Sequence, residues 1–323
     1  MPVFIKYLLL ISLLSFLMAS FPILTILMAI LWGGSLIIAS IYLDSKQMLA
    51  IIGLSIAILY VVAGANASFY YLTFYGASAV VMSLLVNTTK EGYYHLQKWG
   101  ITAAVIGVTL FILSAYLSTG QIGIQEMEKQ LNIYMQENNQ QLEQSGIIKL
   151  YEERGISREE LEDSIGRMVK AFAYHMPAIY YLQAILAAFF MLLLGTFLYH
   201  KRGLERLRKK PFKNEIMPWQ LVWVIIAGLA LWLLGRAQQM NSLYYTGSNI
   251  LVVMLPISVY FGLATVVFKL KQQKPVYQKW FTIILIILSI FFLPSAVIFF
   301  SIIGVFDALM DYRKLRLEKE DGT

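Results

Sequence analysis

Long stretches without a single charged residue constrain this chain more than any other feature. One runs from Tyr7 to Leu43, a second from Gln47 to Val86, and a third from Trp280 to Phe306. About 20 apolar helical residues cross the hydrocarbon core of a bilayer. The composition agrees with membrane spans. The chain is 59% hydrophobic and only 14% charged, and the core of a soluble protein could not bury so many apolar side chains. The sequence therefore predicts an all-α polytopic transmembrane helical bundle.

The long runs must be divided, because each of the first two exceeds one span. Ser20-Phe21-Pro22 is the predicted break in the first run, since proline lacks a backbone N–H. Small and turn-forming residues predict a second break at residues 64–68. With further spans over residues 100–117, 172–199, 219–235 and 250–268, the chain is predicted to hold about eight to ten membrane segments.

The last run raises a problem of length. As one helix, residues 280–306 would measure about 40 Å, longer than one upright span and too short for two. Pro294-Ser295 is a candidate break that would make the run a re-entrant pair. A single span and a re-entrant pair place the charged tail, residues 307–323, on opposite sides of the membrane.

The basic loops predict orientation, because cytoplasmic loops carry the excess of Lys and Arg. Residues 201–217 are strongly basic and are predicted to be cytoplasmic. Counting spans backwards places the N-terminus in the cytoplasm, and counting forwards places the basic residues 269–279 there too. The expected location is the bacterial inner (cell) membrane, and we favour a cytoplasmic tail, which requires the re-entrant pair.

One segment, residues 121–170, is soluble in character, with apolar residues at helical spacing. Ser157 and Glu160 have the spacing of a capping box, and the helix after them is expected to run into the next span as far as Pro177. We predict an extracytoplasmic amphipathic helical insert, serving either as a lid or docking element or as a solvated connector. The predicted organisation is spans one to five in 1–120, the insert in 121–170, a sixth span in 171–200, a basic loop in 201–217, C-terminal spans in 218–306 and the tail in 307–323.

Polar and aromatic residues are predicted to gather at the outer ends of several spans. Arg236 could hold a carboxylate or phosphate bidentately, with aromatic walls and amide groups beside it. The alternative is an ordinary interfacial aromatic belt with a snorkelling arginine. The predicted ligand-binding residues are Arg236, Asn66, Tyr71, Tyr75, His175, Gln239, Asn241 and Tyr245.

The sequence evidence for a catalytic site is weaker than that for a ligand-binding site. Asp307 and Asp311 lie four residues apart and could share a metal ion, somewhat like the end of the CDP-alcohol phosphotransferase motif, but the upstream Asp-Gly and Ala-Arg elements of that motif are missing. No zinc-protease, nucleophile-elbow or P-loop pattern is present. We therefore predict no enzyme activity, metal or cofactor, and expect the acids to form local ion pairs with Arg313 and Lys314 where the helix leaves the membrane.

The net charge of +7 lies mainly in the loops, which favours attraction to anionic lipid over nucleic-acid binding. The predicted partners are accordingly the lipid bilayer and no nucleic acid. The absence of cysteine excludes disulfides and thiolate metal sites.

Two stretches carry a family resemblance. "PFKNEIMPWQLVW" from Pro211 and "GVFDALMDYRKLR" from Gly304 resemble signatures of the YybS-like family of bacterial polytopic membrane proteins. The pattern of spans and the polar insert also resemble that family, so the resemblance extends over nearly the whole chain.

The N-terminal region of that family is similar to the S components of energy-coupling factor (ECF) transporters, in which six helices bind a solute. Residues 171–200 would complete such a six-helix unit. In S components, small residues on the first helix let it dock on the coupling subunit. Ser15 and Ala19 have the spacing of such a pair, but this spacing also occurs wherever two membrane helices pack closely. The resemblance implies a transport subunit served by an ABC-type ATPase and a coupling membrane subunit, and it names no substrate. The predicted pocket residues favour a small anionic or aromatic solute. The insert and the spans beyond residue 200 depart from a minimal S component. The alternative is a non-catalytic scaffold or regulatory protein that recruits a partner through its basic cytoplasmic loops.

Overall fold

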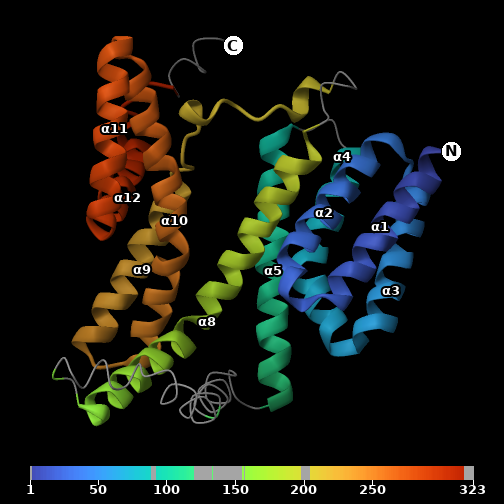
Figure 1. Ribbon diagram of the computed structural model, residues 1–323, viewed down its shortest axis with the longest axis horizontal. Helices are drawn as coiled ribbons and strands as arrows, with labels where there is room; N and C mark the ends of the chain where they lie inside the picture. The colour runs from blue at the N-terminus through green and yellow to red at the C-terminus, as the bar shows by residue number, and fades with distance from the viewer. Residues whose placement is uncertain are drawn as a thin grey trace. The chain divides into compact units, whose positions relative to one another are not determined.

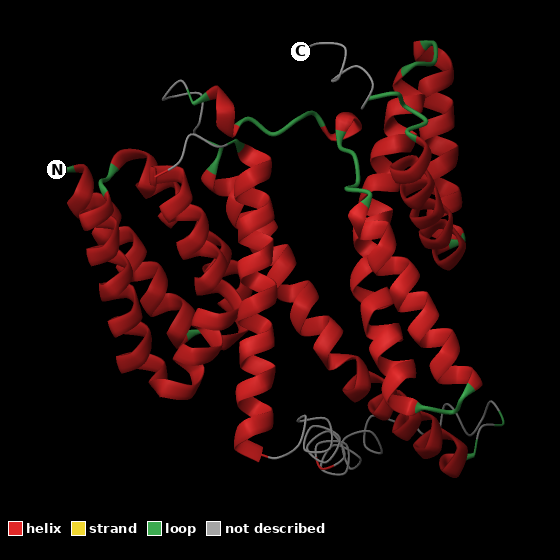
Figure 2. Ribbon diagram, turned by 180° about the vertical axis from the view of Figure 1, so that it is seen from behind, coloured by secondary structure: helices red, strands yellow, loops and turns green. Residues whose placement is uncertain are grey.

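The computed structural model describes residues 2–88, 92–119, 133, 155, 157–197 and 204–315. Within them the chain is helical, and Figure 2 shows helices and loops but no strands. Residues 1–209 and residues 210–323 form two compact units. The all-α fold predicted from the apolar runs is confirmed.

The first unit is a bundle of long helices (Figure 1). Its principal elements are α1 (Val3–Ser20), α2 (Thr25–Tyr42), α3 (Ser45–Tyr71), the π-helix η2 (Leu72–Gly76), α4 (Ala77–Thr88), α5 (Tyr93–Thr119) and α8 (Arg158–Gly195). Short 3₁₀ turns lie at Pro22–Leu24 and Glu205–Leu207. Most of the predicted insert lies outside the described residues.

Both predicted breaks in the apolar runs are confirmed. Helix α1 ends at Ser20 and a 3₁₀ turn that starts at Pro22 leads into α2. In α3 the backbone leaves helical geometry at Gly64, with φ 80° and ψ 175°, a conformation that is essentially restricted to glycine. The Ser68 hydroxyl donates to the Gly64 carbonyl at 2.7 Å, which satisfies a backbone acceptor at the kink.

Helix α8 is longer than the span predicted from its apolar residues. It begins with the predicted capping box: the Ser157 hydroxyl accepts from the Glu160 N–H at 3.2 Å, and the Glu160 carboxylate accepts from the Ser157 N–H at 3.1 Å. It then continues through Pro177, where the predicted helix was expected to stop. Proline is tolerated inside membrane helices because neighbouring groups satisfy the carbonyl that it leaves unbonded.

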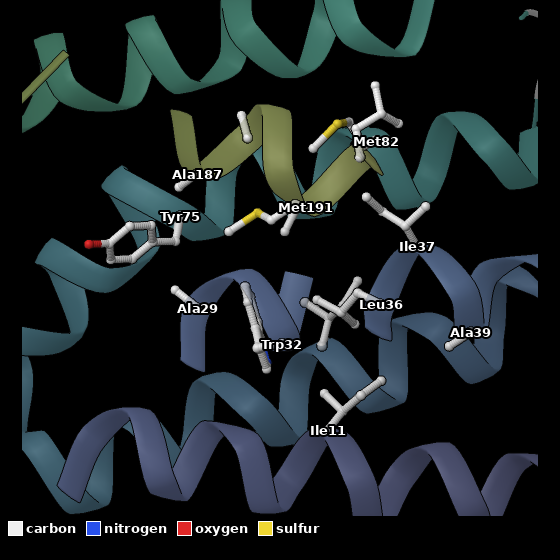
Figure 3. Close-up of a cluster of buried hydrophobic side chains, with 14 of the residues drawn as sticks. Ile11, Ala29, Trp32, Leu36, Ile37, Ala39, Tyr75, Met82, Ala187 and Met191 are labelled. Carbon is white, nitrogen blue, oxygen red and sulfur yellow. The ribbon is translucent and has the colours of Figure 1, made fainter. Parts of the chain in front are cut away.

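The core of the first unit is built around α2. Figure 3 shows Trp32 and Leu36 of α2 between Ile11 of α1 and Met191 of α8. All four side chains are buried. Gly33 allows close packing here, since a side chain at this position would meet the Met191 thioether. Small residues at helix contacts are the usual way for membrane helices to approach closely.

The second unit contains η5 (Phe212–Asn214), α9 (Gln220–Ala237), α10 (Asn241–Lys271), α11 (Pro275–Phe291) and α12 (Leu293–Met310). Helix α10 packs closely on α12 through two glycines. A Cβ atom on Gly262 would overlap the Phe300 carbonyl oxygen, and one on Gly304 would overlap that of Ser258. The two backbones are therefore in direct contact.

Residues 280–306 do not form one helix. The chain breaks at Phe292 (φ −121°, ψ 47°), two residues before the predicted break, and Pro294 lies in the first turn of α12, where its missing N–H costs nothing. The Lys269 ammonium, near the end of α10, contacts the Tyr312 carbonyl, just after α12, at 3.5 Å. The ends of the two helices therefore lie close together. The predicted break into two helices is confirmed, and the start of the tail lies at the same end of this unit as Lys269. That the two helices re-enter the membrane stays a prediction.

Eight helical segments within the described residues are long and apolar enough to cross a membrane, and α11 is a shorter apolar helix. One of these segments, Ser45–Val86, contains the kinked α3 together with η2 and most of α4, so it corresponds to two of the predicted spans. The count agrees with the predicted range of membrane segments.

Candidate functional site

The π-helix η2 is the most irregular part of the first unit. It follows α3 directly and places Thr73, Phe74 and Tyr75 in the bundle interior, where each is buried. The Thr73 hydroxyl donates to the carbonyls of Phe69 (2.8 Å) and Tyr70 (3.1 Å), which occupies acceptors in the turn where the helix widens. Such single π turns occur frequently at functional sites, because the extra residue redirects the side chains around it.

A hydrogen-bonded group of uncharged side chains lies against this turn. The Gln183 amide of α8 donates to the Tyr70 hydroxyl at 2.7 Å and also contacts the Tyr75 hydroxyl. The two tyrosine hydroxyls are 3.4 Å apart. Tyr75 is fully buried, so its hydroxyl depends on protein partners rather than water. We call Tyr70, Tyr75 and Gln183 the amide–tyrosine cluster.

Aromatic rings surround the cluster. Phe74 lies 4.3 Å from the Tyr70 ring centroid, and Phe111 of α5 lies 5.7 Å from it. Tyr180 of α8 contacts Phe74 edge-on at 5.4 Å, and Tyr71 contacts Tyr70 at 5.6 Å. These separations are typical of favourable aromatic pairs. Four helical elements thus contribute to one aromatic and amide environment.

Helix α5 approaches the π-helix closely at Gly107. A Cβ atom there would overlap the Thr73 carbonyl oxygen. Two residues further along α5, the hydroxyls of Thr109 and Tyr181 are 2.9 Å apart, which joins α5 to α8 outside the cluster. The close approach fixes the position of the π-helix against α5.

The chemistry available at the cluster is neutral. Hydroxyl and amide groups can donate and accept hydrogen bonds, and the rings can stack on a planar ligand. Within the part of the chain that the structure describes, no group of three or more His, Asp or Glu side chains could hold a metal ion. The arrangement suits recognition of an uncharged or aromatic molecule better than acid–base chemistry.

The structure brings two predicted site residues to this cluster. Tyr75 belongs to it, and Tyr71 lies in its aromatic shell. Asn66 is exposed on the turn that follows the Gly64 kink. His175 is partly exposed on α8, with its Nδ1 2.7 Å from the Ala171 carbonyl oxygen. Two of the predicted tyrosines therefore lie together, whereas none of the hydrogen bonds given for the described residues links Asn66 or His175 to them, and ligand binding by these residues stays a prediction.

The other predicted residues gather at the connection between α9 and α10 in the second unit. Arg236 is exposed in the last turn of α9, and Gln239 is exposed with φ 55°. Asn241 begins α10, and Tyr245 packs on Tyr244 at 5.2 Å. One pocket formed by all eight residues stays a prediction.

Gln183 is the residue that the sequence reasoning missed. It is an amide within the apolar stretch of α8, and polar side chains at membrane depth are costly enough to suggest a role. That signal was available in the sequence. Its partners were not, because Tyr70 and Tyr75 lie more than a hundred residues earlier.

A second cluster of polar residues holds the end of α12 in place. Arg313 is buried and donates to the Asp307 carboxylate from Nε at 3.0 Å and from Nη2 at 2.7 Å. It also donates to the carbonyls of Lys213 and Glu215, both at 2.6 Å. The predicted ion pair of Asp307 with Arg313 is confirmed, and it ties the loop before α9 to the end of the last helix.

Asp311 does not share this environment. It is the left-handed C-cap residue of α12, with φ 45° and ψ 53°, and its carboxylate accepts from the Leu315 N–H at 3.2 Å. The two acids that looked like a metal-binding pair therefore have separate structural roles.

A family model for predicted membrane proteins, DUF2232, matches residues 9–308. The chain belongs to the DUF2232 family. The matched residues include both the amide–tyrosine cluster and Asp307. Comparisons with curated proteins and with solved structures found no match. DUF2232 membership establishes an integral membrane protein, and the YybS-like and S-component resemblances stay predictions.

Proposed function

We propose that this DUF2232 protein is the solute-binding membrane subunit of a transporter and that its first unit holds the solute. The observation that carries the proposal is the amide–tyrosine cluster at the π-helix. Tyr75 is buried, and Tyr70 and Gln183 are partly buried. Polar side chains inside a membrane bundle are costly, and they commonly mark a ligand site or a pathway. An aromatic shell with a few fixed polar groups is also the usual composition of a small-molecule site.

The cluster favours one of the two predicted solute classes. Tyr70, Tyr75 and Gln183 offer hydrogen bonds without charge, and Phe74, Phe111 and Tyr180 offer ring faces and edges. An aromatic or other uncharged planar solute matches these groups better than an anion. Arg236, on which the anionic option depends, lies in the second unit.

Energy would come from a separate subunit, because the sequence contains no P-loop motif. We place the protein in the bacterial inner membrane with its N-terminus in the cytoplasm, following its basic loops. No reaction is assigned to it: Asp307, the best candidate for a catalytic or metal-binding acid, is paired with Arg313. The S-component docking face would need revision, since Ser15 is fully buried within the first unit.

A pull-down from native cells in mild detergent tests the transport assignment. We expect the tagged full-length protein to recover an ABC-type ATPase and a coupling membrane subunit, identified by mass spectrometry and enriched over an unrelated polytopic membrane protein carrying the same tag. Recovery of cytoplasmic enzymes or envelope proteins without any ATPase would contradict it.

A conservative pair of variants tests the site itself. Tyr75→Phe removes one hydroxyl from the amide–tyrosine cluster, whereas Tyr181→Phe removes one that bonds to Thr109 outside it. Loss of a hydrogen bond to a solute should weaken binding about tenfold, whereas the control should bind like the wild type. The measurement is the amount of small molecule that co-purifies with each protein, quantified by mass spectrometry. Equal amounts in all three proteins would remove Tyr75 from the site.

A scaffold function is the second candidate, and one observation favours it. The bonds from Arg313 to the Lys213 and Glu215 carbonyls hold the last part of the basic loop, just before α9, in place. A fixed basic loop can serve as a docking surface for an acidic partner. In the same pull-down, this function would appear as a cytoplasmic partner that is lost at high salt.

A further inference from the structure

A groove lies within the second unit, between α10, α11 and α12. Its volume is about 680 Å³, within the range of about 300–1,000 Å³ that is usual for small-molecule sites. Phe281 of α11 and Ile302 and Phe306 of α12 form its apolar wall. Their exposed fractions, 54%, 50% and 43%, show that the wall is open on one side rather than sealed in the core.

One end of the groove is polar. Lys269 and Gln273, from the last turn of α10 and the residues after it, lie there together with Tyr312, which follows α12. The Lys269 ammonium contacts the Tyr312 carbonyl at 3.5 Å, and a lysine ammonium has three donors in all. Among the described residues that line the groove, Lys269 carries the only charge. The groove therefore has a basic end and an apolar wall.

This polarity matches an amphiphile whose head is negative. Basic residues at the ends of membrane helices attract anionic lipid headgroups, and pockets between helices at that level can hold them. A neutral or zwitterionic lipid would fill the apolar part equally well but would gain less from Lys269. Helix α11 has no buried side chain within the second unit, so its apolar residues are available there to contact lipid.

We propose that the groove is a binding site for an anionic phospholipid of the bilayer, with its phosphate at Lys269 and an acyl chain along Ile302 and Phe306. This site is separate from the amide–tyrosine cluster and does not depend on the proposed transport function. It would make the conformation of the C-terminal helices sensitive to the lipid composition of the membrane.

Lipid titration of the delipidated full-length protein, followed by native mass spectrometry, tests the charge requirement. The probes are phosphatidylglycerol and phosphatidylcholine with identical acyl chains. We expect Lys269→Gln to weaken phosphatidylglycerol binding about fivefold, the loss appropriate to one basic residue at a membrane surface, and to weaken phosphatidylcholine binding by a smaller factor. Lys271→Gln, which changes a neighbouring lysine outside the lining of the groove, should bind both lipids like the wild type. Equal losses for the two variants, or none for Lys269→Gln, would overturn the proposal.

A second variant tests the groove without changing charge. Ile302→Trp should fill the apolar wall and abolish the tight phosphatidylglycerol adduct, whereas Leu309→Trp, at a position of similar exposure on α12 outside the groove, should keep it. Retention of the adduct in the Ile302→Trp protein would show that the lipid binds elsewhere. A co-purifying polypeptide that excludes both lipids from the wild-type groove would also overturn the proposal.

Discussion

Replacing Arg313 with methionine is expected to lower the free energy of unfolding by about 3–5 kcal/mol, the usual cost of removing one partner of a buried ion pair. Arg313 and Asp307 are both buried, with side-chain exposures of 0% and 2%. The variant would leave the Asp307 carboxylate buried without its counter-charge, and the other carboxylate oxygen, Oδ1, already has no hydrogen-bond partner among the described residues. Unfolding by SDS, followed by tryptophan fluorescence, measures the change.

Two further proteins make this result specific. Lys314→Met removes the adjacent, exposed cation and should be nearly neutral. In the double variant Asp307→Asn/Arg313→Met, no buried charge is left unpaired, so the double variant should be more stable than Arg313→Met alone. A double variant that is less stable than Arg313→Met would show that the pair contributes through something other than its charge.

The same substitution should also expose the loop before α9. Arg313 donates to the carbonyls of Lys213 and Glu215, and methionine cannot replace those bonds. Limited trypsin digestion of the Arg313→Met protein should therefore cut near Lys213 sooner than digestion of the wild type or of Lys314→Met.

Gly262→Ala is the second large effect that we expect, with a loss of about 1–3 kcal/mol from overpacking. A Cβ atom at this position overlaps the Phe300 carbonyl oxygen, and backbone cannot rotate away as a flexible side chain can. Helices α10 and α12 must separate, which also disturbs the contact of Gly304 with Ser258. Gly262→Val should be more damaging still.

Gly53→Ala is the matched control for this prediction. Gly53 is also inside a long helix, α3, but a Cβ atom there meets nothing within 4 Å. Alanine favours a helix over glycine by about 1 kcal/mol, so this variant should be neutral or stabilised. The two variants should thus change SDS resistance in opposite directions. A Gly262→Ala protein as stable as Gly53→Ala would mean that α10 and α12 pack less closely than the structure indicates.

Much of the fold could be predicted because apolar length and chain breakers act locally. Pro22 and Gly64 mark real interruptions, and Ser157 with Glu160 caps α8, since each signal depends only on nearby backbone. Pro177 was misleading for the opposite reason: neighbouring groups in the bundle decide whether a helix continues past a proline.

The candidate site was only partly predictable. Its tyrosines could be selected from the sequence because they lie next to a predicted turn. An interfacial aromatic belt, however, would place tyrosines at the same positions. Gln183 gains its meaning from Tyr70 and Tyr75, and those contacts exist only once α8 packs against η2. The local sequence does not predict the π-helix, because the five residues of η2 are also compatible with an ordinary turn.

The sequence by itself determined a helical membrane protein, most of its helix breaks and the pairing of Asp307 with Arg313, because hydrophobic length, turn chemistry and nearby charges are local properties of a chain. The tertiary structure alone decided that Arg313 also binds the loop before α9, that Gly262 and Gly304 bring two backbones into contact, and that Gln183 joins two tyrosines. Those features depend on the packing of distant segments, and the free energy of packing is set by shape and burial that no short stretch of sequence contains.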